Sequence, residues 1–251
     1  MPRCETLRYG ALPGQEGDLY LPSRRRASVV VLLHGGFWRQ PYGRDQMSAV
    51  AADLQRRGHA VWNLEYRRTA GGAGGWPATF DDVRAGVAYL REAPSGAVDL
   101  GRVTVCGHSA GGHLALWVAA QRRGLAADAG VTVCAAVGQA PVADLVAAHT
   151  LGLGRGAVGE LMGAGPDQAP DRYAAASPAA LLPLGVRQLI LHGVLDDVVP
   201  LALTDAYVAA ARRAGDSVAV RELAGSGHME FLDPSSAAHD ALCGWLAESS
   251  D

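Results

Sequence analysis

The chain has 251 residues, of which 49% are hydrophobic and 19% charged, and its formal net charge is −3. This is enough apolar material for a large core, and at this length one α/β domain is as plausible as two. The small negative charge gives no electrostatic reason to expect a nucleic acid or an anionic membrane as partner. We therefore expect a single domain over 1–251 that acts on a small molecule, and a homodimer is left open.

The N-terminus and the cysteines exclude further classes of protein. The opening MPRCETLRYG has no apolar core of signal-peptide length, and no later stretch approaches about 18 uninterrupted apolar residues, so we expect a cytoplasmic protein. The four cysteines show no CxxC spacing, so we expect neither a disulfide scaffold nor a metal site. They are Cys4, Cys106, Cys134 and Cys243.

Before residue 23, ETLRYG and GDLYLP predict an antiparallel hairpin at a sheet edge, joined by a polar GQEG turn. From residue 29 onward, short aliphatic runs alternate with longer amphipathic ones, which is typical of a parallel sheet flanked by helices. The predicted strands are 29–33, 60–65, 103–106, 131–137, 188–192 and 218–223. The predicted helices are 44–57, 79–92, 110–122, 202–214 and 235–248.

Residues 141–187 break this alternation. They follow a predicted strand but contain the glycine-rich LGLGRGAVGELMGAGPDQAP instead of running directly into a helix and the next strand. Such an insertion is either a flexible loop or a small cap over a site, and we favour the cap. No repeat or low-complexity linker is visible, so the sequence predicts no second domain.

A candidate nucleophile lies in VTVCGHSAGGHLAL, where Gly107-His108-Ser109-Ala110-Gly111 separates a predicted strand from a predicted helix. This is the G-x-S-x-G motif of a nucleophile elbow, and its place between a strand and a helix is the setting in which the motif indicates a catalytic serine. The turn is so tight that the residues two before and two after the serine must lack side chains. A chance match is the competing interpretation in a chain with 32 glycines, but the flanking strand and helix favour the elbow.

A serine nucleophile needs an imidazole to take its proton and an acid to orient that imidazole. In this class of fold the chain order is serine, acid, histidine. His228, in LAGSGHMEFLDP, is therefore the candidate base for Ser109. Asp196 and Asp197 both follow the strand in LILHGVLDDVVP, and spacing alone does not choose between them. Asp144 is a third candidate acid, because some hydrolases of this architecture take the acid from one strand earlier.

The other histidines fit the base less well. His34 and His108 lie inside glycine motifs, where we expect them to brace the backbone. The rest lack a suitable position late in the chain, apart from one inside the last predicted helix; they are His59, His113, His149, His192 and His239.

Four separated segments, HGGFW, GHSAGGHLAL, HGVLDDVVP and GSGHMEF, resemble the α/β-hydrolase fold in order and spacing. NLEYRRTAGGAGGWPATFDDVRAGVAYL, residues 63–90, is also similar to the bacterial esterase/lipase branch close to kynurenine formamidases, whose oxyanion motif reads HGG-x-W. The resemblance covers about residues 28–233. It implies a mostly parallel central sheet flanked by helices, and it is more specific for the fold than for the substrate.

Carried over by position, the resemblance implies that Ser109 is the nucleophile and His228 the general base. It favours Asp196 over Asp197, because the family loop HG-x-x-D-x-x-V-P places its acid at the first aspartate. The implied oxyanion hole consists of the backbone N–H groups of Gly36, Phe37 and Ala110.

These residues predict a serine hydrolase that cleaves small or aryl carboxylic esters through an acyl-enzyme intermediate, with no metal or organic cofactor. An arylformamidase acting on N-formylkynurenine or a related aryl formamide is the alternative, motivated by HGG-x-W. A non-catalytic ligand-binding relative is a third interpretation, but its sign would be a missing triad member. Trp38, Trp76 and His108 are the candidate substrate contacts, although each tryptophan is more often simply core or loop packing.

Overall fold

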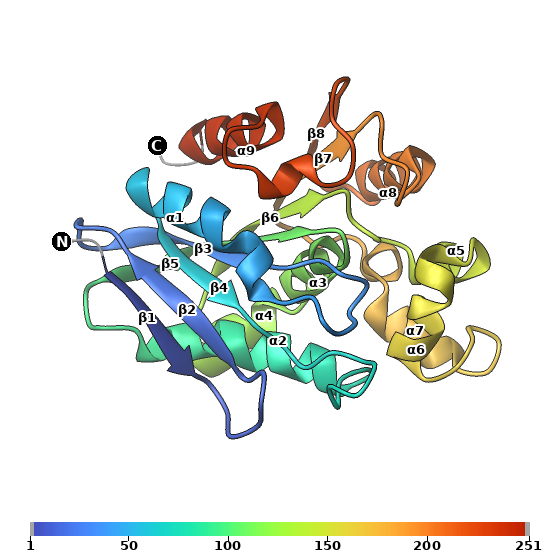
Figure 1. Ribbon diagram of the computed structural model, residues 1–251, viewed down its shortest axis with the longest axis horizontal. Helices are drawn as coiled ribbons and strands as arrows, with labels where there is room; N and C mark the ends of the chain where they lie inside the picture. Colours follow the sequence, from blue (N-terminus) through green and yellow to red (C-terminus); the bar gives the residue numbers. More distant parts are fainter. Residues whose placement is uncertain (1–2, 249–251) are drawn as a thin grey trace.

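The structure, a computed structural model, describes residues 3–248 and is built on an eight-stranded sheet of order β1-β2-β4-β3-β5-β6-β7-β8 (Figure 1). The strands are β1 (Arg3–Arg8), β2 (Glu16–Leu21), β3 (Ala27–Leu33), β4 (Ala60–Leu64), β5 (Val98–His108), β6 (Val133–Gln139), β7 (Arg187–Gly193) and β8 (Val218–Leu223). The β1–β2 and β2–β4 pairs are antiparallel, and the other pairs are parallel. The predicted edge hairpin and mostly parallel sheet are both confirmed.

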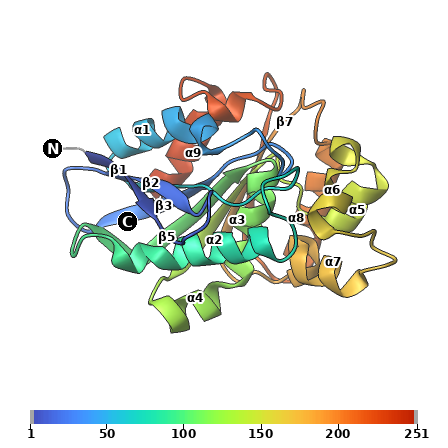
Figure 2. The ribbon, with the colours of Figure 1, turned by 60° about the horizontal axis from the view of Figure 1, so that its bottom comes forward.

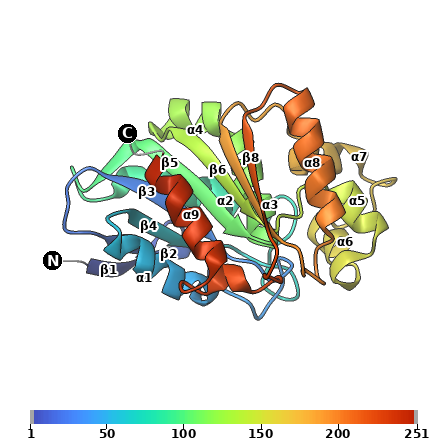
Figure 3. The ribbon, with the colours of Figure 1, turned by 90° about the horizontal axis from the view of Figure 1, so that it is seen from above.

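Helices cover both faces of the sheet (Figures 1 and 3). One face packs against α1 (Ser48–Arg56) and α9 (Ala237–Glu248). The opposite face packs against α2 (Ala78–Ala88), α3 (Ala110–Ala120), α4 (Arg122–Ala129) and α8 (Leu201–Arg213). The central strands are therefore buried on both faces, which explains why they read as continuous aliphatic runs.

Every predicted strand and helix is present, with shifts at the ends. Two helices include a 3₁₀ turn: η1 (Arg44–Met47) precedes α1, and η2 (Tyr89–Glu92) follows α2. The sequence did not predict α4, which follows a break at Gln121 and ends at Gly130 in the left-handed conformation. Among residues 3–248, no helix is long and apolar enough to cross a membrane.

The 141–187 segment is folded into short helices, grouped at one end of the molecule (Figure 2). They are α5 (Leu145–Thr150), η3 (Leu153–Arg155), α6 (Ala157–Met162), α7 (Pro170–Ala176) and η4 (Pro178–Leu181). Several glycines of the segment adopt positive φ at the helix ends, so they act as caps and not as a flexible linker. The Trp117 indole of α3 donates to the Ala175 carbonyl at 3.0 Å, which fixes the segment to the main body.

The parallel strands all end at the same edge of the sheet. The loop after β3 carries the HGGFW motif, β5 ends directly before Ser109, β7 ends at Gly193 before the two aspartates, and β8 ends before His228. The topology thus gathers the sequence motifs at the carboxyl edge, where open α/β sheets bind ligands.

Candidate active site

Ser109 lies on a strained turn between β5 and α3, with φ 56° and ψ −116°. A Cβ on Gly107 would lie 2.1 Å from the Gly111 carbonyl oxygen, and a Cβ on Gly111 would lie 2.0 Å from that of Leu33. Close backbone contact at both positions therefore explains why the residues two before and two after the serine must be glycine, as expected from the sequence. A positive φ at a non-glycine residue is costly, and such strain concentrates at functional sites.

Asp196 orients the His228 imidazole. The Nδ1 of His228 lies 2.7 Å from Oδ2 of Asp196, and the amides of Val198 and Val199 donate to Oδ1 at 2.9 and 2.8 Å. Burial raises the pKa of Asp196, but the hydrogen bonds from His228 and the two amides outweigh it and hold that pKa below its usual value. The ionised carboxylate thus fixes Nδ1, which leaves Nε2 as the ring nitrogen available to Ser109.

The other two candidate acids do not hold His228. Asp197 is exposed, and Asp144 is the N-cap of α5, where its side chain accepts from the amides of Val146 and Ala147 at 3.0 Å each. Within residues 3–248, neither carboxylate contacts His228. The geometry therefore favours the assignment that the family resemblance implied, although the catalytic roles themselves stay predictions.

Three amides are free for a developing oxyanion. Gly36 and Phe37 both have positive φ, 97° and 51°, and line a pocket together with Ser109. Ala110 is the first residue of α3, where an amide has no partner within its own helix. Among the described residues, none of these three N–H groups donates a hydrogen bond. An unpaired N–H beside a nucleophile is what stabilisation of a tetrahedral intermediate needs.

The pocket over Ser109 is small, about 210 Å³. Its rim includes two partly exposed apolar side chains, Tyr42 at 48% and Met229 at 56% exposed. It is lined by Gly36, Phe37, Tyr42, Gln46, His108, Ser109, Val198, His228 and Met229. None of these comes from residues 141–187, so the helical segment lies beside this pocket and does not roof it.

Residues 34–44, which carry the proposed donors Gly36 and Phe37, form what we call the oxyanion loop. The helical segment supports this loop from the side. Arg39 of that loop donates to the Gly154 carbonyl oxygen at 2.6 Å and to both carboxylate oxygens of Glu160 at 2.6 Å. Gly154 also lies against the Phe37 ring, since a Cβ there would be 2.5 Å from it. The contact between Arg39 and Gly154 therefore lies next to Phe37, a proposed oxyanion donor.

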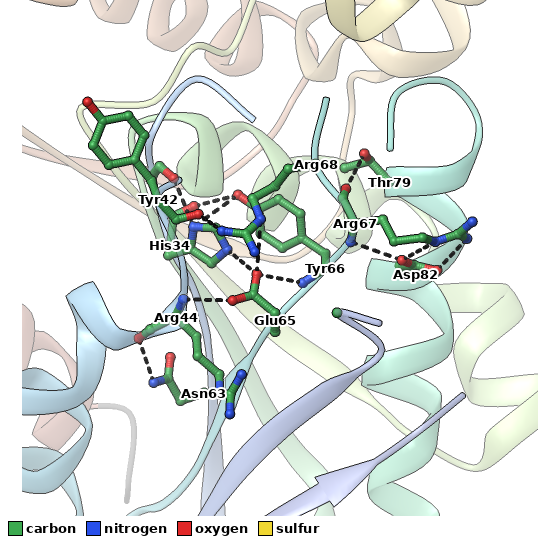
Figure 4. Close-up of polar contacts among 12 residues, drawn as sticks. His34, Tyr42, Arg44, Asn63, Glu65, Tyr66, Arg67, Arg68, Thr79 and Asp82 are labelled. Carbon is green, nitrogen blue, oxygen red and sulfur yellow. Dashed lines mark hydrogen bonds and ion pairs between the residues drawn. The ribbon is translucent and has the colours of Figure 1, made fainter. Parts of the chain in front are cut away.

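A buried carboxylate, Glu65, holds the base of the oxyanion loop (Figure 4). It accepts from His34 Nε2 at 2.8 Å and from the Arg44 amide at 3.1 Å, so it joins the residues at the two ends of the loop. The His34 ring stacks on Tyr66 with centroids 4.3 Å apart. Arg68 lies 3.6 Å from the same carboxylate and donates to the Tyr42 carbonyl.

Burial raises the pKa of Glu65, but the hydrogen bond from His34 and nearby positive charge lower it overall, so the carboxylate is ionised. The expected bracing role of His34 is confirmed. Glu65 itself was missed, because its partners are 21 and 31 residues away in the sequence.

His108 lies behind His228 and not in the open part of the pocket. It is 2% exposed, its Nε2 donates to the His228 carbonyl at 2.8 Å, and the two rings are 4.6 Å apart. Burial, with a smaller contribution from His228, lowers the pKa of His108 to about 3, so it is neutral. The backbone-bracing expectation is confirmed, and a substrate contact is limited to the small part of the ring that lines the pocket.

The two tryptophans are not in the pocket. Trp38 is 0% exposed and packs edge-on against His113 with centroids 5.2 Å apart, so no face remains for a substrate. Trp76 packs against Phe80 at 5.0 Å and is absent from the pocket lining. The prediction that Trp38 contacts the substrate is therefore corrected: its backbone turns at φ 57° and places the ring in the core.

Known proteins similar to this chain agree with the fold. A model of the BD-FAE family matches residues 17–210. A truncated carbohydrate esterase from gut microbiota superimposes with TM-score 0.86 and 22% identity, covering 99% of this chain and 95% of that one. Thermogutta terrifontis esterase 2, phosphoramylated by tabun, gives TM-score 0.79 and 22% identity, covering 100% and 96%. The α/β-hydrolase fold expected from the sequence is confirmed.

A further match is to the kynurenine formamidase of Danio rerio, 32% identical over 112 residues, which is 44% of this chain and 36% of the fish protein. A stretch of 112 residues also matches the kynurenine formamidase of Salmo salar, at 30% identity. The matched stretch thus spans about a third of the length of these curated relatives.

Proposed function

The chain belongs to the BD-FAE family and has the α/β-hydrolase fold, and from this premise we propose that it is a serine hydrolase of small or aryl carboxylic esters. The observation that carries the proposal is the convergence of three elements on one pocket: a serine on a strained turn, a histidine bonded to an ionised aspartate, and unpaired backbone amides. No one of these features is specific alone, because His34 and Glu65 form a similar pair in a structural role, but their convergence on one pocket is what serine hydrolysis requires.

In this mechanism Ser109 Oγ attacks the ester carbonyl while His228 takes its proton. The negative charge on the carbonyl oxygen is stabilised by the amides of the oxyanion loop and of Ala110, and Asp196 stabilises the imidazolium. His228 then gives its proton to the leaving alcohol, which departs and leaves an acyl-enzyme. A water activated by His228 hydrolyses that ester and regenerates Ser109.

The pocket supports a short acyl group. Its 210 Å³ lies below the usual range of about 300–1,000 Å³ for drug-sized ligands. The exposed Tyr42 and Met229 at the rim offer apolar surface to the alcohol part, which suits an aryl leaving group.

The test uses p-nitrophenyl acetate and butyrate as substrates. We expect hydrolysis that falls by roughly 10⁴-fold to 10⁶-fold in Ser109→Ala. Ser95→Ala, at an exposed serine in a loop, is the matched control and should keep wild-type activity. Hydrolysis that survives in Ser109→Ala would remove the site assignment, and no hydrolysis by the wild type would favour a non-catalytic relative.

Arylformamidase activity is the second candidate, supported by the match to the two fish kynurenine formamidases. Buried Trp38 does not strengthen this candidate, because the tryptophan of HGG-x-W lies outside the pocket. Parallel assays with N-formylkynurenine separate the two. A formamide kcat/KM that exceeds the ester values by orders of magnitude would reverse our order.

A further inference from the structure

A second group of chemically active side chains lies between α1 and α9, on the face of the sheet opposite α3 (Figure 3). Asp53 comes from α1, and His239 and Cys243 come from α9. Each offers one ligand atom, and these atoms all lie within 4.8 Å of one another. None of the three lines the pocket over Ser109.

The spacing of the three groups is that of a chelate. His239 and Cys243 are four residues apart on one helix, so their side chains share a face, as in helical two-ligand metal motifs. His239 Nε2 lies 2.7 Å from Asp53 Oδ2 and 3.3 Å from Cys243 Sγ. A tetrahedral ion with bonds of about 2.0–2.3 Å holds its ligand atoms about 3.3–3.8 Å apart, so shifts of about 1 Å in these side chains would fit the three atoms around an ion.

We propose that Asp53, His239 and Cys243 form a binding site for a borderline divalent transition metal such as Zn²⁺. The donor set is one sulfur, one imidazole nitrogen and one carboxylate oxygen, which suits Zn²⁺ or its spectroscopic substitute Co²⁺ and disfavours Mg²⁺ and Ca²⁺. Water completes the fourth position.

The positively charged side chains around the site do not prevent a cation from binding. Arg56 and Arg57 contact the Asp53 carboxylate at 2.8 and 2.5 Å, but their side chains are 65% and 45% exposed. Exposed ion pairs contribute little, so the guanidinium groups turn toward solvent at small cost when a cation arrives. Burial opposes ionisation of Asp53, yet hydrogen bonds from Arg57, His239 and Arg56 lower its pKa to about 2, so it already carries a negative charge.

Binding releases one proton to solvent, from Cys243 Sγ, because the thiolate is the metal ligand. The neutral His239 ring changes tautomer: the proton on Nε2 is exchanged for one on Nδ1, which frees Nε2 to bind the ion with no net proton released from the imidazole. Within residues 3–248, Nδ1 of His239 has no hydrogen-bond partner, so no second contact locks the ring proton in place.

A bound ion would link helices α1 and α9, each of which follows a loop that lines the pocket over Ser109. α1 continues from η1 and the loop that carries Tyr42, and α9 follows the loop that carries His228. Because the ion binds the folded chain and not the separated helices, it stabilises the folded state.

The first measurement is a Co²⁺ titration of the full, reduced chain. We expect a thiolate-to-cobalt charge-transfer band in the near ultraviolet with visible bands of tetrahedral Co²⁺. Zn²⁺ should displace the cobalt, and in a separate melt Zn²⁺ at 100 times its Kd should raise Tm by about 5–10 °C. Mg²⁺ should do neither.

The variants assign the ligands. Cys243→Ser should lose the charge-transfer band, and Asp53→Asn should weaken Co²⁺ binding at least tenfold. Cys4→Ala, at an exposed cysteine, is the matched control and should keep both signals. A wild type with no charge-transfer band and no Zn²⁺-dependent Tm would overturn the proposal without any variant, as would a band that survives in Cys243→Ser.

Discussion

At the scale of single residues, the three candidate acids differ in what their oxygens contact. Both oxygens of Asp196 are occupied, one by His228 and one by two backbone amides, so the carboxylate is held rigidly against the imidazole. Within residues 3–248, the Asp144 side chain accepts only from the first turn of its own helix, and Asp197 faces solvent. The three positions therefore make a matched set for isosteric substitution.

Asp196→Asn should lower kcat on p-nitrophenyl acetate by about 10⁴-fold, because an amide neither holds the required tautomer nor stabilises the imidazolium. Asp197→Asn should leave kcat close to wild type, and so should Asp144→Asn, since asparagine caps a helix as well as aspartate does. Steady-state kinetics on the three purified variants checks this. A large loss at Asp144 or Asp197 with an active Asp196→Asn would move the acid.

The positions of the candidate catalytic residues were predictable from the sequence where the signal is local. Ser109 and His228 lie in short motifs whose order along the chain is characteristic of the fold, so both could be chosen without a structure. Glu65 and Trp38 could not be placed, because burial and long-range pairing depend on how distant segments meet. The cluster of Asp53, His239 and Cys243 was not predicted for the same reason. Asp53 and Cys243 both contact His239, but they are 190 positions apart in the sequence.

At the scale of elements, the strand-turn-helix unit around Ser109 depends on backbone packing that admits no side chain. Gly111 lies on α3 with its Cα against the carbonyl oxygen of Leu33 at the end of β3. Gly124, on α4, is a helical glycine with room: a Cβ there would be 3.8 Å from its nearest neighbour, Arg84. The two glycines therefore predict opposite outcomes for one substitution.

Gly111→Ala should destabilise the protein by about 3 kcal/mol or more, since strand β3 or helix α3 must shift to remove a 2.0 Å contact, and ester hydrolysis should fall with it. Gly124→Ala should stabilise the protein by about 0.4–1 kcal/mol, because alanine costs less backbone entropy in a helix. Urea unfolding measures both. Equal stability of the two variants would contradict the packing at the elbow.

The strands and long helices were predictable because each buries an apolar face with a clear period. The separate helix α4 was not, because its break at Gln121 leaves no proline or glycine in the sequence at that point. The 141–187 segment was ambiguous because its glycines read as a flexible loop, whereas in the structure they cap short helices.

At the scale of the whole molecule, buried neutral histidines lie on both faces of the sheet. His108 packs against Phe231 on the α9 face, and His113 packs against Phe80 on the α2 face. Burial lowers the pKa of His113 to about 4 and, with His228, that of His108 to about 3. Both side chains stay uncharged in the folded state at pH values where the unfolded chain takes up protons.

The sign of the resulting pH dependence follows from linkage. A histidine whose pKa is lower in the folded than in the unfolded chain contributes stability above about pH 6.5, and that contribution is lost as pH falls toward the folded pKa. For His113 the loss reaches about 3 kcal/mol by pH 4, a large share of a typical 5–15 kcal/mol. Carboxylates with lowered pKa, such as Asp196, Glu65 and Asp53, lose their contribution only below about pH 4.5.

Between pH 6.5 and 4.5, therefore, the fall in stability belongs to the histidines. We expect Tm to decrease steadily over this range, and His113→Gln to flatten the decrease, because glutamine keeps an N–H donor for the Ala176 carbonyl but takes up no proton. His149→Gln, at a partly exposed histidine, is the control and should retain the wild-type slope. Melting curves at half-unit pH steps decide the matter. An identical slope in wild type and His113→Gln would mean that His113 is not the neutral, buried group that its surroundings require.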